Sequence, residues 1–154
     1  MTDREILHFI EGKKFSKQLW SPIGRAMHKY NMIEEGDRIA VGISGGKDSL
    51  TTLNALIRVQ KIARLSFEIL PIHIHPNTDQ SSYQKIKDYC EMLGLNLFVE
   101  HTNLEEILFH DENPVKNPCF LCGRIRRGIL YRILQERQIN KLALGHHKDD
   151  IIET

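Results

Sequence analysis

The sequence predicts an α/β fold in which four parallel strands form an open, Rossmann-like sheet with helices on both faces. Short segments rich in Ile, Val and Leu alternate with longer segments whose apolar residues recur at helical spacing. This alternation is typical of β-α-β units, in which right-handed crossovers join parallel strands. At 154 residues the chain has the length of one domain.

The expected elements follow one another with short connections. Strands are expected at residues 38–43, 67–75, 95–101 and 141–144, and helices at residues 48–62, 81–93 and 120–138. Before the first strand, an apolar stripe at helical spacing predicts a helix that packs on the domain and is interrupted near Pro22. The stripe consists of Trp20, Ile23, Met27 and Tyr30. We therefore expect a helical segment over residues 1–33 and an α/β domain over residues 34–154.

A glycine loop after the first strand is the most informative segment. Residues 44–49 have the sequence SGGKDS and lead into a helix. The glycines let consecutive backbone N–H groups turn toward one point, and the helix N-terminus adds partial positive charge. Ser44, Lys47 and Ser49 add further donors, so the loop is expected to bind phosphate. The alternative is a turn in which Asp48 or Ser49 only caps the helix.

Spacing separates this loop from two other phosphate-binding loops. A Walker A loop has four residues between its glycines, whereas three residues separate Gly42 from Gly46. A G-x-G-x-x-G dinucleotide fingerprint is absent because no third glycine stands at the required offset.

Charge is unevenly distributed although the net charge is only +1. Residues 79–112 carry eight acidic residues and two lysines, whereas residues 124–137 carry five arginines and one glutamate. The basic segment either binds a polyanion or forms a solvent-exposed helix face, and composition alone does not decide between these two interpretations. No apolar run has the length of a membrane span, and the first residues lack a signal-peptide core, so a cytoplasmic location is expected.

The cysteines suggest metal binding or catalysis more than a disulfide. Cys119 and Cys122 form a C-x-x-C pair before a helix, where a redox dithiol, a zinc site and an iron–sulfur cluster remain open. Zinc or a cluster would need ligands beyond this pair. Cys90 falls on the apolar stripe of its helix and is expected to pack in the core.

Three motifs in order resemble a known family. The SGGKDS loop is similar to the pyrophosphate loop (PP-loop) of N-type ATP pyrophosphatases, which have an adenine nucleotide alpha hydrolase-like fold. The cysteine pair continues as CGRIRRGILY at residues 122–131, and LGHHKDD follows at residues 144–150. With NMIEEGD at residues 31–37, these segments closely resemble the tRNA 2-thiocytidine biosynthesis proteins from about Ser21 to Thr154.

The resemblance implies an ATP-dependent tRNA sulfurtransferase. In that family ATP adenylates the C2 oxygen of an anticodon-loop cytidine, pyrophosphate leaves, and sulfur from an iron–sulfur cluster replaces the activated oxygen. The implied cofactors are ATP, Mg²⁺ and a [4Fe-4S] cluster. The implied partners are tRNA and a sulfur donor such as a cysteine desulfurase, with no membrane involved, and a homodimer is compatible with the family.

The same resemblance implies roles for individual residues. Pyrophosphate would be held by Ser44, Gly45, Gly46, Lys47, Asp48 and Ser49. Adenosine would lie near His73 and Gly145, and the expected catalytic residues are Lys47, Asp48 and Asp150, the last as a magnesium ligand or positioning group. Cys119 and Cys122 would be two of three cysteine ligands of the cluster. RNA phosphates would be met by Arg124, Arg126 and Arg127.

The chain departs from the family pattern in two respects. Family members are longer, and their third cysteine ligand and fifth strand normally follow the Asp149-Asp150 motif, so we expect a fragment or a truncated gene product. His75-Pro76 stands where the family more often has an acidic residue. Two other functions therefore stay open: transfer of AMP to another acceptor, and ATP binding without catalysis.

Overall fold

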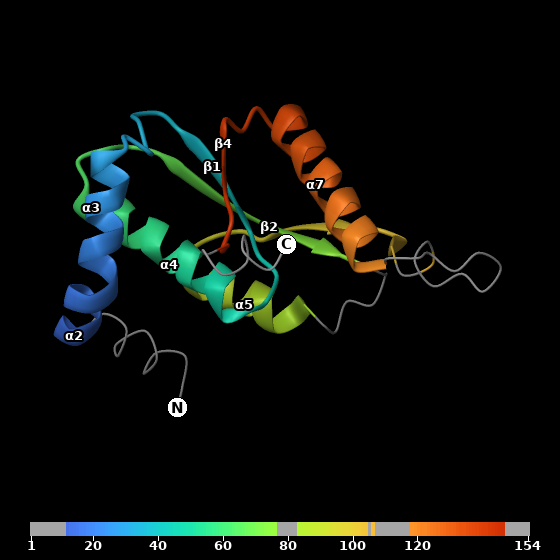
Figure 1. Ribbon diagram of the computed structural model, residues 1–154, viewed down its shortest axis with the longest axis horizontal. Helices are drawn as coiled ribbons and strands as arrows, with labels where there is room; N and C mark the ends of the chain where they lie inside the picture. The colour runs from blue at the N-terminus through green and yellow to red at the C-terminus, as the bar shows by residue number, and fades with distance from the viewer. Residues whose placement is uncertain (1–11, 77–82, 105, 107–117, 147–154) are drawn as a thin grey trace.

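The computed structural model describes residues 12–76, 83–104, 106 and 118–146, with only the backbone described for residues 118–121. Four parallel strands form one sheet in the order β3-β2-β1-β4 (Figure 1). The strands are β1 (Arg38–Gly42), β2 (Glu68–His75), β3 (Phe98–His101) and β4 (Lys141–Ala143). This arrangement confirms the predicted α/β class and the parallel sheet.

Helices cover both faces of the sheet, as predicted (Figure 1). One face packs against α4 (Lys47–Ile62) and α5 (Gln84–Met92), and the other against α7 (Pro118–Glu136). An N-terminal helical segment, which lies beside α4, consists of α2 (Lys13–Phe15), the π-helical turn η1 (Ser16–Trp20) and α3 (Ser21–Lys29). Pro22 lies in the first turn of α3, where its missing N–H is tolerated.

Two apolar clusters form the core, one on each side of the sheet. Ile39, Val41 and Ile43 face the first cluster with α4 and α5, whereas Ala40 of β1 faces the second. In the second cluster, Ile133 of α7 packs with β2 residues. Successive strand residues point to opposite faces, so a central parallel strand must be apolar on both.

Two details differ from the sequence prediction. β3 begins at Phe98 rather than Leu95, because the chain first closes the C-terminus of α5. The Leu95 N–H donates to the Cys90 carbonyl oxygen, and Gly94 has a φ of +77°. In the N-terminal stripe, Trp20 is buried, but Tyr30 follows the end of α3 and is 63% exposed. The division at residues 33 and 34 stays a prediction.

Candidate nucleotide-binding site

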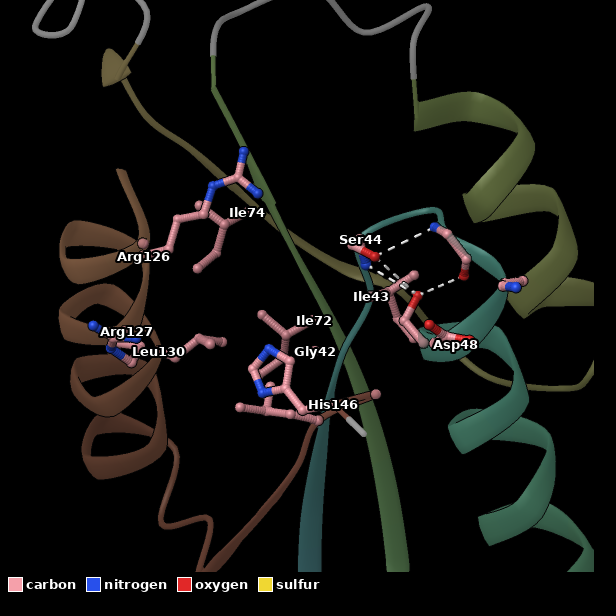
Figure 2. Close-up of a pocket in the computed structure, with 16 residues that line it drawn as sticks. Gly42, Ile43, Ser44, Asp48, Ile72, Ile74, Arg126, Arg127, Leu130 and His146 are labelled. Atoms are coloured by element: carbon pink, nitrogen blue, oxygen red, sulfur yellow. Dashed lines mark hydrogen bonds between the residues drawn. The ribbon is translucent and has the colours of Figure 1, made fainter. Parts of the chain in front are cut away.

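A cavity of about 460 Å³ lies at the carboxyl ends of β1, β2 and β4, between the start of α4 and α7 (Figure 2). Ligands gather at this edge of open α/β sheets. The glycine loop forms one wall, and the first half of α7 forms the opposite wall. The floor between them is apolar and comes from Ile72, Ile74, Leu130 and Leu144.

The glycine loop is closed by its own hydrogen bonds (Figure 2). The Ser49 hydroxyl accepts from the backbone N–H and the hydroxyl of Ser44, each at 3.2 Å, and donates to the Gly46 carbonyl at 3.0 Å. The Ser44 hydroxyl accepts from the Gly46 N–H at 3.3 Å. Gly45 has a φ of +87°, a conformation that favours glycine. Lys47 is exposed at the first position of α4, so its ammonium can reach a phosphate held by the loop.

Gly145 touches the backbone of the glycine loop from β4. A Cβ atom at this position would lie 2.6 Å from the carbonyl carbon of Asp48 and 2.7 Å from the nitrogen of Ser49. Those neighbours are backbone atoms, which cannot move aside as a flexible side chain can. The absence of a side chain at Gly145 therefore lets β4 and the loop close one wall of the cavity.

The α7 wall supplies positive charge. Arg126 and Arg127 line the cavity, as does Gly123, whereas Arg124 is exposed outside the lining (Figure 2). The Nε atom of Arg126 is buried and has no hydrogen-bond partner within the described residues. Two of the three predicted RNA-binding arginines thus face the same space as the phosphate loop.

His73 is not among the residues that line the cavity, and its expected place near adenosine stays a prediction. Ile72 and Ile74 line the cavity, so His73, which stands between them on β2, points to the opposite face of the sheet. Its side chain is 8% exposed and lies among Tyr83 and His75. Burial, together with the nearby His75, Arg126 and His101, lowers the pKa of His73 below its usual value of 6.5, although the bond to Ile43 opposes this shift.

The cysteines occupy separate places. Cys90 is fully buried in the cluster between the sheet and α4 with α5, as predicted, and burial raises its pKa to about 11. Cys122 is half-buried near the start of α7, on the other side of the sheet. The backbone of Cys119 lies one turn earlier in α7. Asp150 lies outside the described residues.

A family model described as the PP-loop domain matches residues 17–154. The chain belongs to the PP-loop family. Curated relatives named tRNA-cytidine(32) 2-sulfurtransferase include one from Acaryochloris marina, 42% identical over 92% of this chain and 50% of the relative. Another, from Dichelobacter nodosus, is 41% identical over 94% of this chain and 54% of the relative. The chain therefore spans about half the length of the curated relatives it matches.

A solved structure has a similar fold. It is the U34-tRNA thiolase NcsA from Methanococcus maripaludis with its [4Fe-4S] cluster. The TM-score is 0.68 and the identity 26%, over 85% of this chain and 46% of that one. This likeness confirms the predicted fold class, and the family match confirms the PP-loop resemblance.

The apolar floor of the PP-loop cavity was not predicted from the sequence. Ile72 and Ile74 alternate with His73 and His75, which predicts that the isoleucines share one face of the sheet. Because residues 71–75 are all buried, that alternation does not tell which face meets the cavity. The feature that would have identified the lining residues is the pairing of β2 beside β1, in which Gly42 lies opposite Ile72. That register brings Ile72 next to the start of the loop.

Proposed function

We propose that the chain binds ATP in this cavity and forms the ATP-using part of a tRNA sulfurtransferase of the 2-thiocytidine type. The observation that carries the proposal is the shared cavity, in which the PP-loop and two arginines face each other across an apolar floor. The loop and Lys47 suit the β- and γ-phosphates, and the apolar floor suits a base. The names of the curated relatives support tRNA as the substrate.

The proposed reaction makes an unreactive carbonyl oxygen into a leaving group. The C2 oxygen of an anticodon-loop cytidine attacks the α-phosphorus of ATP, and the bond from that phosphorus to the bridging oxygen breaks. Negative charge builds on the departing pyrophosphate, where Lys47 and the N–H groups of the loop stabilise it. A sulfide-level sulfur nucleophile then forms a bond to C2, and AMP leaves with the electron pair of the broken C2–O bond. Mg²⁺ would add positive charge at the phosphates, with Asp48 and Asp150 as its proposed neighbours.

Cys119 and Cys122 are proposed to hold a [4Fe-4S] cluster, which would supply the sulfur when bound. Residues three apart on a helix lie on one face, so both backbone positions suit a shared metal group. Gly123, the next residue, lines the cavity, so a group held here would lie near the activated base. Cys90 is unsuited as a further ligand because it is fully buried across the sheet.

The arginines of α7 divide into two groups under this proposal. Arg126 and Arg127 contact the nucleotide or the target base inside the cavity, whereas Arg124 contacts RNA phosphates outside it. A sulfur donor such as a cysteine desulfurase, a cytoplasmic location and a homodimer remain expectations from the family. No helix within the described ranges combines the length and the apolar character that a membrane crossing requires.

The test begins with ATP binding to the purified chain by calorimetry. Lys47→Ala should weaken binding by about tenfold or more, because it removes a charge-assisted contact to phosphate. Lys61→Ala is the matched control, since Lys61 is exposed at the other end of α4. Failure of the wild-type chain to bind ATP would contradict the proposal.

Exchange of labelled pyrophosphate into ATP then tests the acceptor. Stimulation by a tRNA anticodon stem-loop supports the thiolation reaction. Stimulation by small acceptors and not by RNA would instead favour AMP transfer to another substrate. ATP binding with no exchange under either condition would identify an ATP-binding module that lacks catalysis.

A further inference from the structure

A buried hydrogen-bond chain lies behind the PP-loop, on the side of the sheet away from the cavity. The Nδ1 atom of His73 lies 2.7 Å from the carbonyl oxygen of Ile43, the residue directly before the loop. The Nε2 atom of His73 lies 3.3 Å from Nδ1 of His75. His73 and His75 are 8% and 3% exposed, so water cannot easily replace these bonds.

The Ile43 carbonyl at one end of this series of hydrogen bonds determines which atoms donate and which accept. A carbonyl oxygen only accepts, so Nδ1 of His73 must carry a proton and donate to Ile43. In the neutral ring Nε2 then has a free lone pair, and the Nδ1–H of His75 donates to it. The lowered pKa of His73 is consistent with a neutral ring. His75 thus fixes the ring orientation that lets His73 reach the loop.

The Ile43 carbonyl belongs to the same peptide unit as the Ser44 N–H. In a trans peptide these two groups point in opposite directions within one plane. The Ser44 N–H donates to the Ser49 hydroxyl, so the unit is held by His73 on one side and by the loop on the other. The Ile43 N–H is also fixed, because it donates to the Ile72 carbonyl at 2.8 Å. Without the His73 bond, only the Ser44 N–H bond to Ser49 would hold this peptide plane among the bonds of the described residues, and we expect the Ser44 amide to tilt.

We propose that His73 is a positioning residue that orients the first peptide of the PP-loop through the Ile43 carbonyl, with His75 holding its ring from behind. This inference rests on the proposed binding of ATP by that loop. It replaces the expected role of His73 at adenosine with one exerted through the backbone. His73 does not touch the ligand, and its effect on affinity comes from the geometry of the Ser44 amide.

Two substitutions separate the Nδ1 bond from the rest of the side chain. In His73→Asn the amide nitrogen stands near the position of Nδ1 and can still donate to Ile43. In His73→Gln the amide nitrogen stands near Nε2 and cannot. His101→Gln is the control within the same group of rings, because His101 contacts Tyr83 and His75, whereas the ring bonded to the Ile43 carbonyl is that of His73. ATP affinity and the urea midpoint of unfolding are measured for all four proteins.

We expect His73→Gln to weaken ATP binding by about tenfold, while His73→Asn and His101→Gln stay within about threefold of wild type. Equal losses in His73→Asn and His73→Gln would mean that the ring only fills space, and wild-type affinity in His73→Gln would also overturn the inference. If the wild-type chain binds no ATP, the proposed function itself is wrong, and that result is distinguishable from a failure of the inference about His73.

An ATP-independent measurement completes the test. The ¹⁵N shifts of the His73 ring report which nitrogen carries the proton, and the Ser44 amide shift reports the orientation of the peptide. We expect the Nδ1–H tautomer and a Ser44 amide shift that changes in His73→Gln but is retained in His73→Asn. The Nε2–H tautomer in the wild-type protein would overturn the inference whether or not ATP binds.

Discussion

The two edges of the sheet use polar groups in opposite ways. At the amino edge, Asp37 before β1 is 4% exposed and accepts hydrogen bonds from the Glu34 N–H and Asn140 Nδ2, both at 2.7 Å. Its carboxylate also lies 2.6 Å from the ammonium of Lys141. At the carboxyl edge residues 44–47 of the loop are exposed, and Arg126 Nε has no hydrogen-bond partner within the described ranges.

This difference separates stability from binding within one sheet. The Asp37 network joins the turn before β1 to the start of β4, more than a hundred residues later. Within the described residues, Asp37, Asn140 and Lys141 are each paired with another member of this network. The carboxyl edge keeps its loop closed by hydrogen bonds within residues 44–49, whereas Lys47, Arg126 and Arg127 line the cavity beside it. Mutations at the amino edge should therefore change stability, whereas mutations at the carboxyl edge should change ATP binding.

The largest effect on stability is expected for Asp37→Ala. The change leaves Asn140 and Lys141 without their acceptor and should lower the free energy of unfolding by about 2–4 kcal/mol. Urea unfolding monitored by the fluorescence of the buried Trp20 measures it. The ATP affinity of the folded protein should not change, because the network is at the opposite edge from the cavity.

Asp88→Ala provides the control for this prediction. Asp88 is exposed on α5 and accepts a hydrogen bond from Gln84. Its removal should change stability by about 0.5 kcal/mol or less. Similar losses in the two variants, or weaker ATP binding by folded Asp37→Ala, would break the proposed separation between the edges.

Gly145→Ala should affect both stability and binding, because it acts where β4 meets the PP-loop. The added carbon would overlap the backbone of Asp48, which should cost about 1–3 kcal/mol and weaken ATP binding by about tenfold. Gly128→Ala is the matched control, since among the described residues no atom outside its chain neighbours and its own helical backbone lies within 4 Å of the added carbon. On helix α7 that change should be neutral or stabilising by up to about 1 kcal/mol. Wild-type binding by Gly145→Ala would show that the loop tolerates displacement.

The amino-edge network also predicts a pH dependence. Lys141, the Glu34 N–H and Asn140 lower the pKa of Asp37 from 3.8 to about 2. Because the pKa of Asp37 is lower in the folded protein than in the unfolded chain, its carboxylate stabilises the fold at any pH above the unfolded pKa. This contribution is lost as the pH falls from about 4 toward 2. By pH 3 the loss should be on the order of 1 kcal/mol. The stability difference between wild type and Asp37→Ala should narrow over this range, and a constant difference would contradict the assignment.

The sequence predicted the parts of the site that depend on local chemistry. The PP-loop is set by the glycines and hydroxyls of residues 44–49, and its observed hydrogen bonds lie within that segment. The face of β2 that meets the cavity depends instead on packing against α7, and the sequence did not show that Ile72 and Ile74, rather than His73, line it. The close approach of Gly145 to Asp48 joins residues far apart in sequence, which no local pattern reports.

The smallest expected effect on ATP binding comes from the arginines of α7, and it shows whether they contact ATP directly or act only through their long-range charge. Arg126→Gln and Arg124→Gln remove the same charge from the same helix, but only Arg126 lines the cavity. Arg126→Gln should weaken ATP binding by about threefold to tenfold and keep most of that loss in high salt, since a contact inside a cavity is poorly screened. Arg124→Gln should have a smaller effect that high salt removes. Equal, salt-sensitive losses would mean that α7 acts on ATP only through its field, which would confine direct phosphate binding to the PP-loop.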